Sequence, residues 1–133
     1  MRKESSLKAH RQTNRQRNFL ADRWFALRMA LEGVTYVLHT QCSAWIEIIA
    51  SLVCIMAGWW FNIARLEWAL ILLIICVIFA LEAVNTAIES VVDLVSPEYH
   101  RLAKIAKDTA AAALIFAVIG SLLIAALVFI PYL

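Results

Sequence analysis

Four polar side chains recur along one otherwise apolar segment in the second half of the chain. Glu82, Asn85, Glu89 and Asp93 follow one another at intervals of three, four and four residues. At 3.6 residues per turn of an α-helix, their side chains fall within an arc of about 80° on one face. We call this set the polar stripe. The residues between its members are apolar or small, so the pattern predicts a helix with one acidic face.

The residue types of the polar stripe favour a magnesium site. A carboxylate near the centre of a bilayer costs at least ~2.5–3.5 kcal/mol, and carboxylates in one row repel each other unless a cation or proton lies between them. Carboxylate and amide oxygens, without His or Cys, favour Mg²⁺ over zinc or copper. Lys107 and Asp108 add a cation and a further carboxylate. A lysine beside magnesium-binding carboxylates is typical of phosphoryl transfer, and the sequence has no glycine-rich phosphate loop, so helices must build any nucleotide site.

Two other interpretations of the polar stripe stay open at this point. Its acidic residues could mark a helix end that protrudes into water, which accounts for Asp93 and less well for Glu89. It accounts poorly for Glu82, which directly follows an apolar run. Carboxylates inside a membrane can also line a path for ions or protons, although three helices would have to oligomerise to enclose one.

The composition indicates that these residues lie in a membrane. Of the 133 residues 63 % are hydrophobic, with a mean hydropathy of +0.78, whereas soluble domains use roughly 45–50 % apolar residues. Three runs, at about 44–61, 66–95 and 108–130, approach the ~20 residues that cross a bilayer as a helix. Residues 18–40 place apolar side chains at helical spacing among charged ones. We therefore expect an all-α integral membrane protein in one domain, with three transmembrane helices plus an N-terminal amphipathic surface helix.

The distribution of positive charge predicts the topology. Eight of the twelve Lys and Arg residues lie within the first 28 residues, and we expect residues 1–17 to form a flexible basic segment. A second basic segment, 98–107, is expected to be a loop. By the positive-inside rule both segments are cytoplasmic and the C-terminus is outside. Such a membrane-like chain is not expected to bind nucleic acid, its start has no signal-peptide pattern, and its three scattered cysteines are expected to be packing residues.

The polar stripe and the residues after it resemble a known family. The run E-A-V-N-T-A-I-E-S-V-V-D at 82–93 is followed by A-K-D at 106–108. This is similar to the pattern of the bacterial diacylglycerol kinase and undecaprenol kinase family of small trimeric membrane kinases, and the resemblance covers about residues 23–133. It implies a multi-pass protein of the bacterial inner membrane with its active site at the cytoplasmic interface. It also implies ATP as donor, Mg²⁺ as cofactor and a membrane lipid alcohol as acceptor, with undecaprenol and diacylglycerol both open.

The resemblance also implies a role for each site residue. Glu82 is expected to be the general base that takes the proton from the lipid hydroxyl, and Glu47 is expected to contact the lipid with it. Glu89 is expected to bind the metal, and Asn85 to orient the phosphates. The expected nucleotide contacts are Gln41, Asn85, Glu89, Asp93, Lys107 and Asp108.

Gln41 departs from the family pattern. Counting back from Ala57-Gly58, the second metal-binding glutamate of the family falls on Gln41, and a glutamine binds magnesium more weakly through its neutral carbonyl. Glu32 or Glu47 could compensate, or the enzyme could be slow. The alternative function is a weakened or inactive relative that binds nucleotide or lipid.

The carboxylates also predict self-association. Three helices are expected to shield Glu47, Glu82 and Glu89 from lipid poorly, so copies should associate. Small residues on the third span permit close helix packing; they are Ala110–Ala113, Gly120, Ser121, Ala125 and Ala126. The expectation of a homotrimer comes from the resemblance alone.

Overall fold

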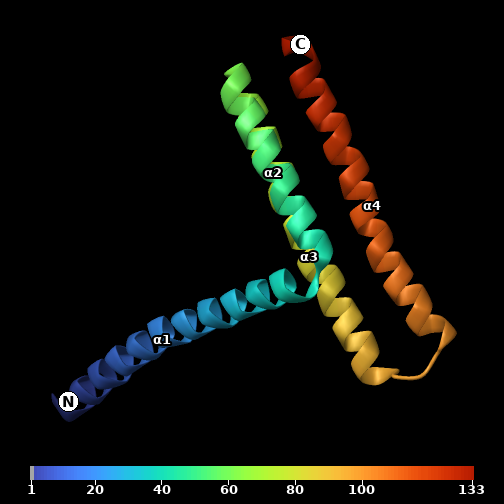
Figure 1. The fold of residues 1–133 in the computed structure, drawn as a ribbon. Helices are drawn as coiled ribbons and strands as arrows, with labels where there is room; N and C mark the ends of the chain where they lie inside the picture. Colours follow the sequence, from blue (N-terminus) through green and yellow to red (C-terminus); the bar gives the residue numbers. More distant parts are fainter. Residues whose placement is uncertain (1) are drawn as a thin grey trace. The chain divides into compact units, whose positions relative to one another are not determined.

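The computed structural model describes the backbone of residues 2–133 and the side chains of residues 19–133. The chain divides into two units, Met1–Tyr36 and Val37–Leu133. Its elements, labelled in Figure 1, are α1 (Arg2–Thr40), α2 (Cys42–Phe61), α3 (Arg65–Val95), α4 (Arg101–Phe129) and the short 3₁₀ helix η1 (Ile130–Tyr132). No strand occurs among the described residues, which confirms the all-α class.

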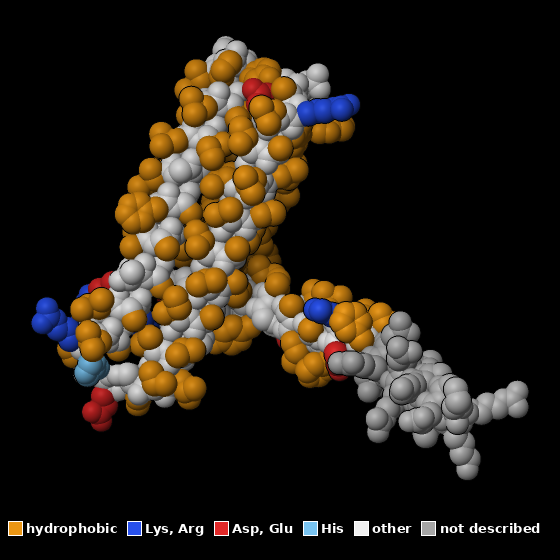
Figure 2. Space-filling model, turned by 180° about the vertical axis from the view of Figure 1, so that it is seen from behind, with side chains coloured by type: hydrophobic (Ala, Val, Ile, Leu, Met, Phe, Trp, Pro, Cys, Tyr) orange, Lys and Arg blue, Asp and Glu red, His pale blue; other side chains and the backbone are white. Residues whose placement is uncertain are grey.

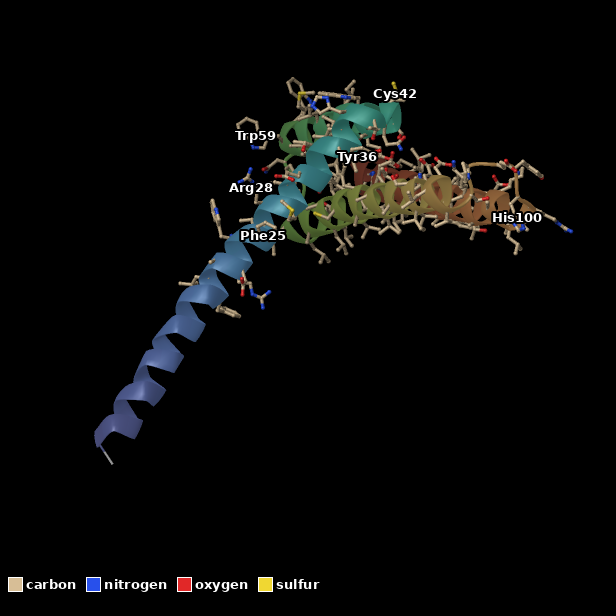
Figure 3. All side chains as sticks on the ribbon, turned by 90° about the horizontal axis from the view of Figure 1, so that it is seen from below. Phe25, Arg28, Tyr36, Cys42, Trp59 and His100 are labelled. Atoms are coloured by element: carbon tan, nitrogen blue, oxygen red, sulfur yellow. The ribbon has the colours of Figure 1, made fainter. Side chains whose placement is uncertain are left out.

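Helix α1 contributes most of the first unit. The predicted helix over 18–40 is confirmed as helical, and large apolar side chains along it, among them Phe19, Trp24 and Phe25, are exposed. Phe25 and Arg28 are labelled on this helix in Figure 3. The side chains of the predicted basic segment 1–17 lie outside the described residues, and its flexibility stays a prediction.

The second unit contains three helices that are long and apolar enough to cross a membrane, which confirms the predicted number of spans. Helix α3 packs along α4, and α2 packs against α3 and more lightly against α4. Hydrophobic side chains cover these helices, and charged side chains gather near the helix ends (Figure 2). Trp59 and His100 lie toward opposite ends of the unit (Figure 3).

The turn between α2 and α3 sets how the two helices align. Asn62 adopts the left-handed conformation with φ of 52°, and the amide of Ile63 donates to the Gly58 carbonyl at 3.2 Å. A Cβ on Gly58 would lie 3.0 Å from both Ile63 Cδ1 and the Trp68 ring. Glycine at this position therefore permits the close approach of α2 and α3.

A buried apolar cluster lies at the end of the unit beside this turn. Ile63, Ile71 and Val128 form a buried cluster that joins the turn, α3 and α4. The Tyr132 hydroxyl donates to Glu67 Oε2 at 2.7 Å, and the same oxygen accepts from the Ala64 amide at 2.7 Å. These contacts attach the C-terminal η1 segment to the start of α3.

Helix α3 is longer than α2, and the excess emerges at the other end. α2 has 20 residues and α3 has 31, which correspond to lengths of about 30 and 46 Å. Because the short turn holds the two antiparallel helices level at one end, α3 extends past the start of α2 at the opposite end. The bilayer core is ~30 Å thick, so α2 matches it and the end of α3 projects beyond it.

Helix α4 begins earlier than the sequence predicted. The expected loop over 98–107 is wrong from Arg101 onward, because α4 starts there rather than at about residue 108. His100 caps the helix, since its Nδ1 accepts a hydrogen bond from the Leu102 amide at 3.2 Å. Polar residues do not stop a helix that has left the membrane, so Lys104 and Lys107 lie on a helical extension.

Candidate functional site

The most deeply buried polar side chains of the described residues are the first two members of the polar stripe and their neighbour Thr86. Glu82 is 1 % exposed, Asn85 6 % and Thr86 4 %. The Thr86 hydroxyl donates to the backbone carbonyl of Glu82 at 2.9 Å, which satisfies Thr86 within its own helix. A single chain therefore shields Glu82, and the expectation that this residue needs a second copy to exclude lipid is wrong. Glu47 and Glu89 are half-buried.

Glu82 on α3 lies opposite the start of α2. Its Oε1 accepts a hydrogen bond from the Ser43 hydroxyl, 39 residues earlier in the chain. Its Oε2 is buried and has no hydrogen-bond partner among the described residues. Glu47, one turn further along α2, interacts electrostatically with Glu82, and its own Oε2 is likewise buried and unpaired in the described part of the chain. The two carboxylates that the sequence assigned to the lipid substrate are thus neighbours.

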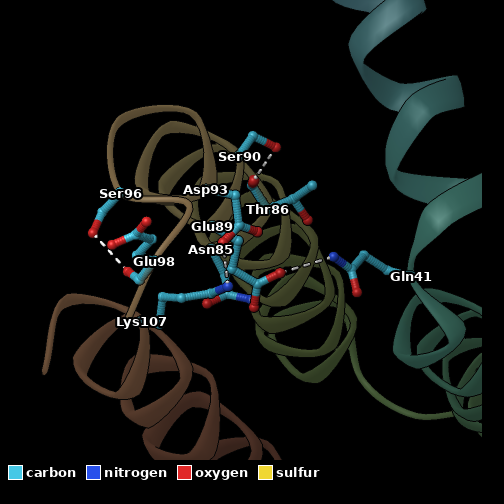
Figure 4. A network of polar contacts seen from close by, with 9 residues as sticks. All are labelled: Gln41, Asn85, Thr86, Glu89, Ser90, Asp93, Ser96, Glu98 and Lys107. Atoms are coloured by element: carbon cyan, nitrogen blue, oxygen red, sulfur yellow. Dashed lines mark hydrogen bonds and ion pairs between the residues drawn. The ribbon is translucent and has the colours of Figure 1, made fainter. Parts of the chain in front are cut away.

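Glu89 is held on both of its oxygens by side-chain amides. Gln41 Nε2 donates to Oε2 at 3.1 Å, and Asn85 Nδ2 donates to Oε1 at 2.9 Å (Figure 4). We call this arrangement the amide clamp. Amide donors keep the carboxylate oriented without neutralising its charge. Glu32, the other suggested substitute for a family glutamate, pairs with Arg28 at 3.2 Å within α1.

The remaining predicted nucleotide residues lie where α3 projects and α4 begins. Lys107 Nζ lies 2.8 Å from Asp93 Oδ1, joining the two helices, and Lys104 pairs with Asp108 one turn along α4. A cavity of about 470 Å³ opens between these helices and the loop that joins them. The charged and aromatic residues that line it are Asp93, Glu98, Tyr99, His100, Lys104, Lys107 and Asp108.

Tyr99, His100 and Lys104 line this cavity but were not among the site residues predicted from the sequence. Their signal was present, because His100, Lys104 and Lys107 recur at intervals of four and three residues and thus share a helix face. Treating 98–107 as a loop hid that periodicity.

An apolar cavity of about 220 Å³ lies between α2, α3 and α4. Glu47 is its one charged lining residue among the described side chains, and the lining is otherwise aliphatic apart from Ser51, Cys54 and Ser121. The cavity therefore runs from the Glu47 carboxylate into the hydrocarbon-facing part of the unit.

The donor set around Glu89 fits a magnesium ion that is shared with phosphates. No group of three or more His, Cys, Asp or Glu side chains in the described part of the chain could hold a metal by itself. Buried Asn85 Oδ1, which has no partner among the described residues, lies beside Glu89 instead. Mg²⁺ typically takes one or two carboxylates and completes its shell with water and phosphate oxygens. Glu89, Asn85 and the Gln41 carbonyl supply such a partial shell.

Comparisons with known proteins identify the family. The model of the family "Prokaryotic diacylglycerol kinase" matches residues 28–129. The chain is 38 % identical over 107 residues to a diacylglycerol kinase of Synechocystis, covering 80 % of this chain and 61 % of the relative. It is 39 % identical over 100 residues to the undecaprenol kinase of Bacillus subtilis, covering 74 % and 80 %. A diacylglycerol kinase of Escherichia coli is 33 % identical over 73 residues, covering 55 % and 60 %. The match thus spans about three fifths of two of these relatives and four fifths of the third, and the chain belongs to the prokaryotic diacylglycerol kinase family.

Proposed function

We propose that this membrane protein is an ATP-dependent lipid kinase that phosphorylates the hydroxyl of a membrane alcohol at the cytoplasmic interface. The observation that carries the proposal is the order of groups along α3. A buried carboxylate, Glu82, is followed by the clamped carboxylate Glu89 and then by Asp93. Asp93 borders the cavity of about 470 Å³ that Lys104 and Lys107 line, which we call the lysine-lined cavity. A base for an acceptor and a metal-binding group therefore follow one another on α3, and the phosphate-binding lysines of α4 lie beside the end of the same helix.

The surroundings of Glu82 suit a lipid hydroxyl. Glu82 Oε2 is buried and, in the described structure, accepts no hydrogen bond, so it is available to take a proton. The apolar cavity below Glu47 suits part of a hydrocarbon chain. The level of Glu82 with the start of α2 supports a position for this carboxylate near the boundary of the bilayer core, where a lipid hydroxyl is found.

The surroundings of Lys104 and Lys107 suit the phosphates of a nucleotide. Lys104 and Lys107 bring two positive charges to a cavity that Tyr99 and His100 also line. Glu89, Asn85 and Gln41 would hold magnesium, which when bound neutralises phosphate charge during the transfer. Asp93 orients Lys107 by their 2.8 Å ion pair.

The proposed transfer uses these groups. The lipid oxygen forms a bond to the γ-phosphorus, the bond from that phosphorus to the leaving oxygen of ADP breaks, and the hydroxyl proton moves to Glu82. Most of the rate enhancement in such reactions comes from positioning and charge stabilisation. In the proposed mechanism, the side chains on α2, α3 and α4 provide both the positioning and the charge stabilisation.

The alternative of an inactive relative, which rested on Gln41, finds no support. The relatives reported above are all named as kinases, and in this chain Gln41 contributes a hydrogen bond to Glu89. The acceptor stays open between diacylglycerol and undecaprenol, because relatives named for each are 38 % and 39 % identical to this chain.

We also propose that copies of the chain assemble as a trimer with cytoplasmic N-termini. Large apolar side chains on both α2 and α4 are exposed in the single chain, including Ile46, Met56, Phe116 and Leu127. Lipid can cover such surfaces as well as another copy can, so their exposure supports contact with either.

A kinase assay tests the function. Purified protein is incubated with magnesium, γ-labelled ATP and a panel of lipid alcohols, and label is expected in phosphatidic acid or undecaprenyl phosphate. Glu82→Gln and Glu89→Gln should each abolish transfer. An inactive wild type on every alcohol would overturn the proposal, and full activity in Glu82→Gln would overturn the assignment of the base.

A further inference from the structure

The first residues of α2 direct their polar side chains across to α3. Gln41 occupies the N-cap position, where a polar side chain commonly accepts a hydrogen bond from its own helix, yet its amide donates to Glu89. Ser43, two residues on, likewise donates its hydroxyl to Glu82 on the neighbouring helix. The start of α2 thus supplies one hydrogen-bond donor to each of the two site carboxylates.

The bond from Ser43 makes the two oxygens of Glu82 different. Oε1 is occupied by the serine hydroxyl, while Oε2 is buried and accepts no bond from any described residue. The two oxygens are otherwise chemically equivalent, so exchanging them changes nothing, but a smaller rotation about the Cγ–Cδ bond would break the Ser43 bond of a side chain that is 1 % exposed. The serine hydroxyl therefore fixes the plane of the carboxylate and leaves one of its oxygens unpaired.

We propose that Ser43 is a positioning residue that holds Glu82 so that Oε2 faces the acceptor hydroxyl. This inference rests on the proposed kinase function, because it concerns the same carboxylate. The role differs from that of a simple tie between α2 and α3, because Gly58, Ile63 and Ile71 already hold the helices together at the other end. Ser43 lies at the opposite end of α2, where its hydroxyl is the one hydrogen-bond donor to the Glu82 carboxylate among the described residues.

The proposal predicts a specific kinetic change. In Ser43→Ala the base keeps its charge and burial but loses its fixed orientation, so kcat should fall about 10- to 100-fold, as is typical when a reacting group is misplaced. The KM for ATP should stay unchanged, because the Ser43 hydroxyl bonds to Glu82, which is neither part of the amide clamp nor a lining residue of the lysine-lined cavity. Ser43→Thr retains the hydroxyl and should restore most of the rate.

A matched control and a double variant separate positioning from a general structural effect. Ser90→Ala also removes a serine hydroxyl, one that donates at 2.8 Å to its own helix, and it should leave kcat and KM unchanged. In the Glu82→Asp background, where a shorter side chain already moves the carboxylate away from Ser43 but keeps a base, adding Ser43→Ala should cause little further loss of kcat, because residues that act through one another are not additive.

A spectroscopic measurement completes the test independently of turnover. The infrared carboxylate band of Glu82 is assigned by its loss in Glu82→Gln, and it should shift in Ser43→Ala and return in Ser43→Thr. An unmoved band would overturn the Ser43 bond itself. A shifted band with an unchanged kcat in an active enzyme would overturn the positioning role. If the band shifts in Ser43→Ala but the wild type phosphorylates no alcohol, the proposed function is overturned, and the positioning role with it.

Discussion

Gln41 and Glu89, 48 residues apart in sequence, are joined by a hydrogen bond of 3.1 Å between the side-chain amide of one and the carboxylate of the other. The bond links the N-cap of α2 to the middle of the polar stripe on α3. Asn85 donates to the second oxygen of the same carboxylate at 2.9 Å. Glu89 is therefore oriented by two neutral donors, and it is the single carboxylate in the amide clamp.

This relationship predicts how the magnesium requirement responds to Gln41. Gln41→Glu places a second carboxylate against Glu89, and a divalent cation relieves the resulting repulsion. The Mg²⁺ concentration for half-maximal activity should fall roughly threefold to tenfold. Gln41→Ala, which removes a donor without adding charge, should raise it. Rates measured against free Mg²⁺ at saturating ATP check both changes.

Comparing the two Gln41 variants separates charge from orientation. If both variants shifted the Mg²⁺ concentration for half-maximal activity equally and in the same direction, the amide of Gln41 would contribute nothing to holding Glu89. Mn²⁺ binding followed by electron paramagnetic resonance gives the same comparison without turnover.

Lys107 should govern the affinity for ATP. Lys107→Ala removes the positive charge that Asp93 orients at 2.8 Å beside the lysine-lined cavity. We expect the KM for ATP to rise on the order of tenfold or more, with a smaller change in the KM for the lipid. Steady-state kinetics with each substrate varied in turn measures both constants.

Arg101→Ala is the matched control for this prediction. It also removes one positive charge from the first turns of α4, but Arg101 does not line the cavity. An equal rise in the KM for ATP in both variants would indicate long-range charge attraction in place of a bound phosphate contact.

Gly58 should be sensitive to added volume. A Cβ at this position lies 3.0 Å from Ile63 Cδ1 and from the Trp68 ring, so Gly58→Val should destabilise the protein by about 1–3 kcal/mol through overpacking. Thermal unfolding in detergent, followed by circular dichroism, measures the change.

Gly120→Val provides the comparison for Gly58. Nothing in the described structure lies within 4 Å of a Cβ at Gly120, so this variant should unfold near the wild-type temperature. A loss of stability as large as that of Gly58→Val would show that another copy packs against α4 at this position.

The sequence predicted the helices well because their signals are local. The three apolar runs and the shared face of Glu82 and Glu89 follow from helical periodicity, which neighbouring residues determine. The start of α4 was missed because polarity in 101–107 was interpreted as a loop, although a helix can continue beyond a membrane.

The contacts between helices could not be predicted in the same way. Which residue of α2 meets Glu82 depends on how α2 aligns with α3, and the Asn62 turn and the close approach at Gly58 set that alignment. Ser43 therefore carried no signal of its own in the sequence. The sequence pointed to Gln41 as a lost ligand, whereas its hydrogen bond to Glu89 appears only in three dimensions.

The unequal lengths of α2 and α3 have a consequence for which alcohols the protein can use. α2 is about as long as the bilayer core is thick, so its first residues fix Glu82 at one depth in the membrane. The rest of α3 extends beyond that depth and carries Asp93 to its ion pair with Lys107. An acceptor would then be selected by the depth of its hydroxyl relative to the lipid headgroups. Lipids with quite different tails would be accepted equally when their hydroxyls lie at the same depth.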